Sequence, residues 1–170
     1  MDVQGNKALL LSTYILDAQQ FHNSTAIGGG WAASKLRTWM MNNFYNEAFS
    51  NSEKRAILTT AQRATSKDTS DDYDTVFILS TDQVKKYLSS TRSRQFDATV
   101  YAKKARKVFK GADGYYNWWT RSNHVESGSF WKDQIDIVRK YGEIAYTKPT
   151  DADCGILPAV WIDINTYNNL

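Results

Sequence analysis

Aromatic and hydrogen-bonding side chains that could hold a ligand are concentrated between residues 115 and 131. Aromatic rings stack on apolar ligand faces while amides and guanidinium groups fix orientation, a mixture typical of glycan and peptide sites. The candidate ligand-binding residues are Tyr115, Tyr116, Asn117, Trp119, Arg121, Asn123, His124 and Trp131. Successive strand residues point to opposite faces, so we expect one of Trp118 and Trp119 in the core and the other outward or in a groove. The alternative is that most of these aromatic residues belong to the core.

An acidic loop at residues 67–74 is the best candidate for a metal site. It carries Asp68, Asp71, Asp72 and Asp74, and Ca²⁺ takes about six to eight oxygen ligands. The loop lacks the Asp-x-Asp-x-Asp-Gly spacing of an EF-hand, so a solvated acidic loop is the simpler interpretation. We therefore predict no cofactor and no metal site, with Ca²⁺ as the alternative.

Nucleophilic catalysis would have to use Cys154 with His22 or His124. The neighbours Asp151 and Asp153 are expected to raise the pKa of the thiol, which is the wrong direction for a reactive thiolate. One cysteine and two widely separated histidines also do not predict a zinc site. An enzyme is therefore a weaker hypothesis than a binding protein.

Size and charge indicate one ordinary globular domain, which we place at residues 1–170. The chain has 170 residues and a net charge of +3, too slight to indicate a nucleic-acid partner. Residues 81–110 carry nine basic and two acidic side chains, so the basic segment 85–110 could dock a partner. No stretch approaches the roughly 20 apolar residues of a membrane span.

Short helices are predicted in the first two-thirds of the chain. Leu36, Trp39, Met40 and Phe44 fall on one face of a helix that begins near Ala32. Capping boxes predict further helices at residues 50–58 and 80–88, and a threonine cap predicts a third at about 99–108. The polar stretch 17–30, with its triple glycine, is interpreted as a loop.

Strands are predicted at both ends of the chain and late in its course. The ranges are 8–12, after a hairpin turn at Gly5-Asn6, then 75–79, 117–122, 135–138, 144–146 and 155–162. Pro158 in the last run requires an edge, a bulge or a strand start. The fold class is α+β, with short helices packed on antiparallel β-sheet and with N- and C-terminal strands. The first strand is expected to be truncated at Met1.

Five sequence blocks resemble a bacterial family known as domain of unknown function 6273. They are 5–12 (GNKALLLS), 34–54 (SKLRTWMMNNFYNEAFSNSEK), 74–80 (DTVFILS), 118–122 (WWTRS) and 155–162 (GILPAVWI). The family commonly has Arg where this chain has Leu157, and Pro-Gly where it has Asn123-His124. The blocks at 118–122 and 155–162 are also similar to strands of C-type-lectin-like folds, including the branch that contains formylglycine-generating enzymes.

The resemblance implies a scaffold that displays a ligand site. Our leading hypothesis is a non-catalytic module of a bacterial surface or secreted protein that binds a glycan, a peptide or a cell-surface protein, without membrane insertion. A structural or interaction domain docking through the basic segment 85–110 is the alternative, and an enzyme of unknown reaction is the second. The expected location is extracellular or at the cell surface if the chain is part of a larger protein, and cytoplasmic if it is complete.

Overall fold

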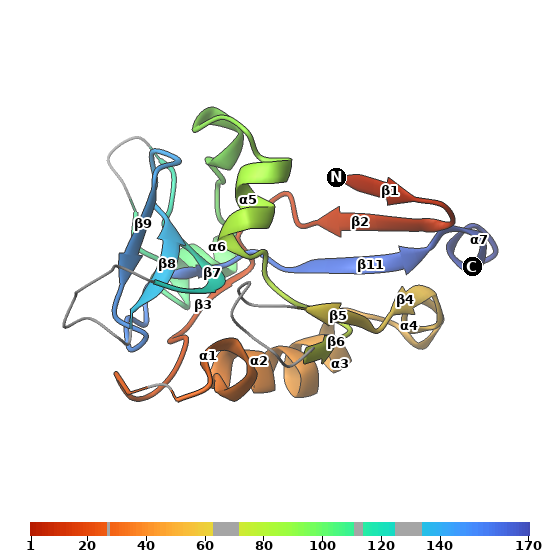
Figure 1. Cartoon of the computed structure of the whole chain (residues 1–170), viewed down its shortest axis with the longest axis horizontal. Helices are drawn as coiled ribbons and strands as arrows, with labels where there is room; N and C mark the ends of the chain where they lie inside the picture. Colours follow the sequence, from red (N-terminus) through yellow and green to blue (C-terminus); the bar gives the residue numbers. More distant parts are fainter. Residues whose placement is uncertain (27, 63–71, 111–113, 125–133) are drawn as a thin grey trace.

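Three β-sheets and a row of short helices make up the computed structural model, which describes residues 1–26, 28–62, 72–110, 114–124 and 134–170 (Figure 1). The fold is mixed α/β with antiparallel sheets and a few short helices, as the sequence predicted. The helices are α1 (Gly30–Ala33), α2 (Lys35–Trp39), the π-helical turn η1 (Met40–Phe44), α3 (Tyr45–Ala48), α4 (Asn51–Ala56), α5 (Thr81–Tyr87), the 3₁₀ turn η2 (Arg92–Arg94), α6 (Val100–Lys104) and α7 (Ile164–Asn168).

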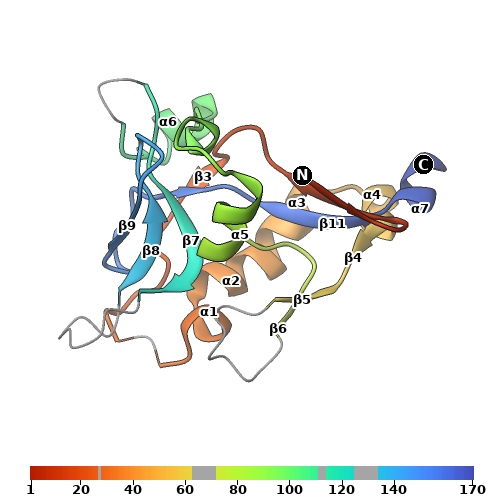
Figure 2. The ribbon, with the colours of Figure 1, turned by 45° about the horizontal axis from the view of Figure 1, so that its top comes forward.

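The first sheet joins the two ends of the chain. Its order is β1 (Asp2–Gln4), β2 (Lys7–Leu11), β11 (Ala159–Asp163) and β4 (Ile57–Leu58), with antiparallel neighbours throughout. Gly5 turns the β1–β2 hairpin with a φ of +58°, a conformation that L side chains rarely adopt. Leu10 pairs with Val160 and Leu9 with Trp161, so β2 lies alongside β11 in both ribbon views (Figures 1 and 2).

The second sheet contains the strand that carries three of the predicted site residues, Trp119, Arg121 and Asn123. Its order is β3 (Asp17–Ala18), β10 (Gly155–Ile156), β7 (Trp118–Asn123), β8 (Ile135–Val138) and β9 (Ile144–Thr147). The β10–β7 pair is parallel and the others are antiparallel. A separate two-stranded sheet pairs β5 (Thr60–Gln62) with β6 (Asp72–Asp74).

Both faces of β7 are covered, and this decides where its two tryptophans lie. The Trp118 ring meets Phe96 at a centroid distance of 5.7 Å, and the Trp119 ring meets Phe21 at 5.5 Å. Both tryptophans are fully buried. The expectation that one of them faces outward is therefore wrong, because alternation along a strand exposes one face only where nothing packs against it.

The predicted helix caps are present. Ser50 and Ser80 each close a capping box with the side chain three residues later, and the Thr99 side chain accepts from the backbone N–H of Ala102. Two helices end earlier than predicted. α4 stops at Ala56 because the next two residues form β4 against β11, and α6 stops at Lys104.

Two predicted strands differ from the structure. Residues 75–79 are largely buried, but they form no regular strand. Phe77 makes an isolated bridge with Ala159, and the oxygen of Leu79 accepts from the N–H of Arg121 in β7 at 3.0 Å. The run 155–162 divides into β10 and β11, which belong to different sheets. The division falls at Leu157 and Pro158, and Pro158 has no N–H to continue a ladder.

The predicted helix after Ala32 is a series of short segments, α1, α2, η1 and α3. Ser34 is extended, with a φ of −70° and a ψ of 143°, and its side chain caps α2 by accepting from the N–H of Arg37. Leu36 and Met40 are buried as predicted, while Trp39 is half-buried. Within the described part of the chain, no helix has the length and apolar character needed to cross a bilayer.

Candidate ligand-binding groove

Two central members of the predicted site, Trp119 and Arg121, lie in the interior. The indole Nε1 of Trp119 donates to the backbone oxygen of Gln19 at 2.8 Å. Arg121 is 2% exposed, and its Nη1 donates to the oxygen of Ile78 at 2.6 Å and to Oε1 of Gln83 at 2.7 Å. Burial lowers the pKa of the Arg121 guanidinium to about 10. Both side chains connect parts of the fold and neither reaches the surface.

The predicted residues before β7 are also engaged by the fold. Tyr116 is buried, and Tyr115 lies 5.4 Å from the Arg92 guanidinium, measured to the ring centroid. Oδ1 of Asn117 accepts from the backbone N–H of Lys140 at 3.0 Å. These three residues precede a six-residue strand, and Asn123 and His124 lie at its other end, roughly 20 Å away. The described members of the predicted set therefore do not form one surface.

At the far end of β7, His124 belongs to a polar cluster. Its Nδ1 lies 2.8 Å from Oδ1 of Asp136, and its ring lies 3.9 Å from that of Tyr146. Oδ2 of Asp136 accepts from the Thr81 hydroxyl at 2.7 Å. This cluster ties α5 to β8. Asn123, the last residue of β7, packs beside Gly30 at the start of α1, and Trp131 lies outside the described residues.

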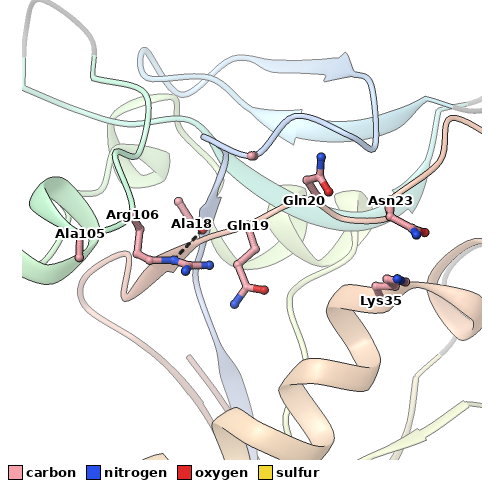
Figure 3. Close-up of a pocket in the computed structure, with 8 residues that line it drawn as sticks. Ala18, Gln19, Gln20, Asn23, Lys35, Ala105 and Arg106 are labelled. Carbon is pink, nitrogen blue, oxygen red and sulfur yellow. Dashed lines mark hydrogen bonds between the residues drawn. The ribbon is translucent and has the colours of Figure 1, made fainter.

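An open groove lies on another part of the surface, along the segment that follows β3 (Figure 3). It consists of two adjoining hollows of about 420 and 440 Å³ that share Gln19, Gln20 and Lys35. The first is also lined by Ala18, Asn23, Ala105, Arg106 and Ala152, and the second by Thr38, Trp39 and Asn43. We call this surface the amide groove because four of its lining side chains are Gln or Asn.

The backbone of the amide groove is held by the core. The N–H of Gln19 donates to the oxygen of Cys154 at 3.3 Å, and the oxygen of Gln19 accepts from buried Trp119. Nε2 of Gln20 donates to the oxygen of Thr150 at 2.7 Å. The side-chain amide of Gln19, by contrast, makes no hydrogen bond to any described residue. The fold thus fixes the segment and leaves that amide available to a ligand.

Two cations lie on opposite sides of the first hollow in Figure 3, Arg106 after α6 and Lys35 at the start of α2. Nε of Arg106 donates to Oδ1 of Asp17 at 2.6 Å and to the oxygen of Ala18 at 3.2 Å. Asp17 is buried, so this ion pair orients the guanidinium. The terminal nitrogens of Arg106 and the ammonium of exposed Lys35 have no partner among the described residues. None of the described residues that line the groove is acidic.

The second hollow is bounded by the helical segment. Thr38 and Trp39 end α2, and Asn43 lies in the π-helical turn η1. π-Helical turns are rare and are frequent at functional sites. The Trp39 ring is half-buried and packs at 5.7 Å from Phe44, which leaves part of its apolar surface on the groove.

Sequence reasoning placed the candidate site on β7 and interpreted residues 17–30 as a loop. The signal it passed over was the adjacent pair of amides at Gln19 and Gln20, just before the aromatic Phe21 that anchors the segment to Trp119. The amide groove needs residues from four separate stretches of the chain, and only the folded structure brings these together.

Asp74 and Cys154, considered above for metal binding and for catalysis, are both buried. Asp74 is fully buried and accepts from Nε1 of Trp31 and from Nε of Arg37, each at 2.7 Å. Asp68 and Asp71 lie outside the described residues, and the residues that are described contain no group of three acidic, His or Cys side chains suited to a metal ion. Burial, together with Asp153 and Asp151, raises the pKa of the Cys154 thiol well above its ordinary value.

The basic segment 85–110 is partly neutralised. Lys86 lies 3.4 Å from Asp2, Lys103 lies 2.7 Å from Asp97, and Arg106 pairs with Asp17. Its remaining positive charge is distributed over α5, η2, α6 and the residues after it.

Comparison with known proteins identifies one family. A family model described as "Domain of unknown function (DUF6273)" matches residues 5–164, nearly the whole chain. No curated protein and no solved structure matches the chain.

Proposed function

This chain belongs to the DUF6273 family, and we propose from its own residues that it is a non-catalytic ligand-binding module whose ligand is a glycan. The binding surface is the amide groove. The observation that carries the proposal is the presence, in one open groove on a rigid segment, of several side-chain amides, a threonine hydroxyl and a half-buried tryptophan.

The lining chemistry suits sugars. Each sugar hydroxyl both donates and accepts hydrogen bonds, and a Gln or Asn side chain does the same, with two donors and one acceptor oxygen. Apolar surface from Trp39 can cover the C–H face of a sugar ring. The groove is open along two adjoining hollows, which fits an oligosaccharide lying across the surface better than a small molecule enclosed on all sides.

A rigid site also lowers the entropy lost on binding. The segment that carries Gln19 and Gln20 is tied to Cys154, Trp119 and Thr150 by hydrogen bonds. A ligand therefore has to order only the side-chain ends and no loop, which favours affinity. Trp119 holds the backbone of Gln19 from the core and does not contact the ligand.

For the fold we propose the C-type-lectin-like type. The support is the antiparallel pairing of β2 with β11, which joins strands near the two ends of the chain, together with the short helices that flank the sheets. A location at the bacterial cell surface or outside the cell follows as part of the same proposal, because glycans of other cells and of cell walls are met there.

The test is a binding screen of the whole chain against neutral and acidic oligosaccharides of galactan, xylan, mannan, chitin and pectin. Titration is followed by tryptophan fluorescence, because Trp39 borders the groove. Gln19→Ala and Asn43→Ala remove lining amides that bond to no described residue, and each is expected to weaken binding several-fold. Asn165→Ala, on exposed α7, is the matched control and should leave affinity unchanged.

The proposal fails if no oligosaccharide of the set binds the folded chain. It also fails if a bound oligosaccharide is unaffected by both groove variants. A peptide that competes with the glycan and depends on the same amides would instead assign the groove to peptide recognition.

A further inference from the structure

We propose that the ligand of the amide groove is an anionic glycan, whose sugar-borne carboxylate or sulfate is held by Arg106 and Lys35. This inference rests on the glycan-binding function proposed above and specifies the class of sugar. Its basis is the placement of two cations on opposite sides of the first hollow of this groove. Their terminal nitrogens have no partner among the described residues, and the described lining of the groove contains no carboxylate.

The orientation of Arg106 is the strongest part of the argument. Its side chain is 35% exposed, yet Nε is engaged by Asp17, whose side chain is 11% exposed. This contact holds the planar guanidinium in place from its Nε side. The two terminal nitrogens have no partner among the described residues. Their two parallel N–H donors match two oxygens of a carboxylate or sulfate. Figure 3 shows the guanidinium directed toward the side chain of Gln19.

Lys35 supplies a second, adaptable charge. It is the first residue of α2, and its backbone N–H donates to Nδ1 of His22 at 3.3 Å, so the start of its side chain is fixed. Its ammonium has no ion pair among the described residues. Because Lys35 borders both hollows, it can reach an anionic substituent on either of two neighbouring sugar rings.

The carboxylates nearby do not cancel these charges within the groove. Asp17 faces Nε of Arg106 and is buried. Asp151 and Asp153 flank the lining residue Ala152, but Asp151 accepts from the hydroxyl of Thr147, and neither lines the groove. The space that a ligand would fill therefore faces positive charge and amides.

The test compares three tetrasaccharides of matched length by calorimetric titration of the whole chain: tetragalacturonate, neutral galactotetraose and a sulfated galactotetraose. An anionic probe should bind at least about tenfold more tightly than the neutral one, which is about 1.4 kcal/mol. The advantage should shrink as salt is raised, since the contact is partly exposed. Comparing the uronate with the sulfate identifies which anion is preferred.

Variants locate the charge contact. Lys35→Gln should lower the affinity for the anionic probe several-fold more than it lowers the affinity for the neutral probe. Arg106→Gln should have the same selective effect on the anionic probe. Urea unfolding of this variant measures whether loss of the ion pair with Asp17 has destabilised the fold. Lys85→Gln, an exposed lysine of α5 outside the groove, is the charge-matched control and should have no effect beyond about twofold.

Several outcomes would overturn the inference. Equal affinity for neutral and anionic probes removes it and leaves glycan binding intact. Equal losses in Lys35→Gln and Lys85→Gln show a general effect of net charge. If none of the three tetrasaccharides binds, the inference fails, whichever result the wider oligosaccharide screen gives for the proposed function.

Discussion

Replacing Arg121 by methionine tests whether this arginine stabilises the fold or binds a ligand. The Arg121 guanidinium is 2% exposed and donates to Ile78 and Gln83, and it lies 5.4 Å from the ring centroid of Phe77. Arg121→Met keeps a flexible apolar side chain in the same space and removes the donors. The oxygen of Ile78 then loses this charged partner. Oε1 of Gln83 still accepts from the N–H of Ser80 at 3.1 Å.

The expected loss follows from these contacts. Hydrogen bonds to a charged group contribute about 1.5–3 kcal/mol each, so the two bonds amount to about 3–6 kcal/mol. Relief of the buried charge offsets part of this, since burial is what lowers the pKa of Arg121 to about 10. We expect the free energy of unfolding to fall by about 2–4 kcal/mol. For a chain of this length that corresponds to a drop in Tm of roughly 4–16 °C.

The assay is urea unfolding of Arg121→Met followed by tryptophan fluorescence, with glycan affinity measured on the folded protein. Arg92→Met is the control, because Arg92 is exposed. Among the described residues it makes a hydrogen bond from Nη1 to Gln95 at 3.0 Å and lies 5.4 Å from the ring centroid of Tyr115, so the change should stay within about 0.5 kcal/mol. The reasoning would be refuted if Arg121→Met were as stable as the control and had lost glycan binding, which would return Arg121 to the ligand site.

Three further perturbations test other parts of the structure. Gly142→Ala should destabilise the β8–β9 turn by at least about 2 kcal/mol, because Gly142 has a φ of +82° and an added Cβ would lie 1.9 Å from the oxygen of Thr91; thermal unfolding measures the loss. Cys154 should resist alkylation in the native protein at pH 8 and react once urea unfolds it, since burial raises the pKa of the thiol; rapid native labelling would contradict this. Ser80→Ala removes one half of the capping box of α5 and should cost about 1 kcal/mol in chemical denaturation, whereas an unchanged midpoint would speak against the cap.

Local signals in the sequence predicted the elements that depend on neighbouring residues. The capping boxes at Ser50 and Ser80 and the turn at Gly5 were found where expected, because each uses side chains or backbone within about one helical turn. Strand β7 was also located. Burial of both its tryptophans was expected only under the alternative that most of these aromatic residues belong to the core, because the rings of Phe21 and Phe96 that cover its two faces come from distant parts of the chain.

The candidate site was harder to predict for the same reason. Gln19, Lys35 and Arg106 come from separate stretches of the chain, and nothing in their sequence spacing indicates that they border one groove. Conversely, the aromatic and polar residues around Trp119 are close in sequence and resemble a ligand site. In the folded chain, the described ones lie in the core or near opposite ends of β7. Residue type alone does not distinguish a buried arginine that supports the fold from one that meets a ligand.

The most direct test of the account is to observe the side-chain amides while a ligand is added. In ¹H–¹⁵N NMR spectra of the chain titrated with tetragalacturonate, the NH₂ signals of Gln19, Gln20 and Asn23 should shift in a saturable way. The NH₂ signal of Asn117 and the indole N–H of Trp118 should stay in place, because both groups are used by the fold away from the groove. Shifts confined to Asn117 and its neighbours on β7, with the groove amides unmoved, would contradict the proposed site.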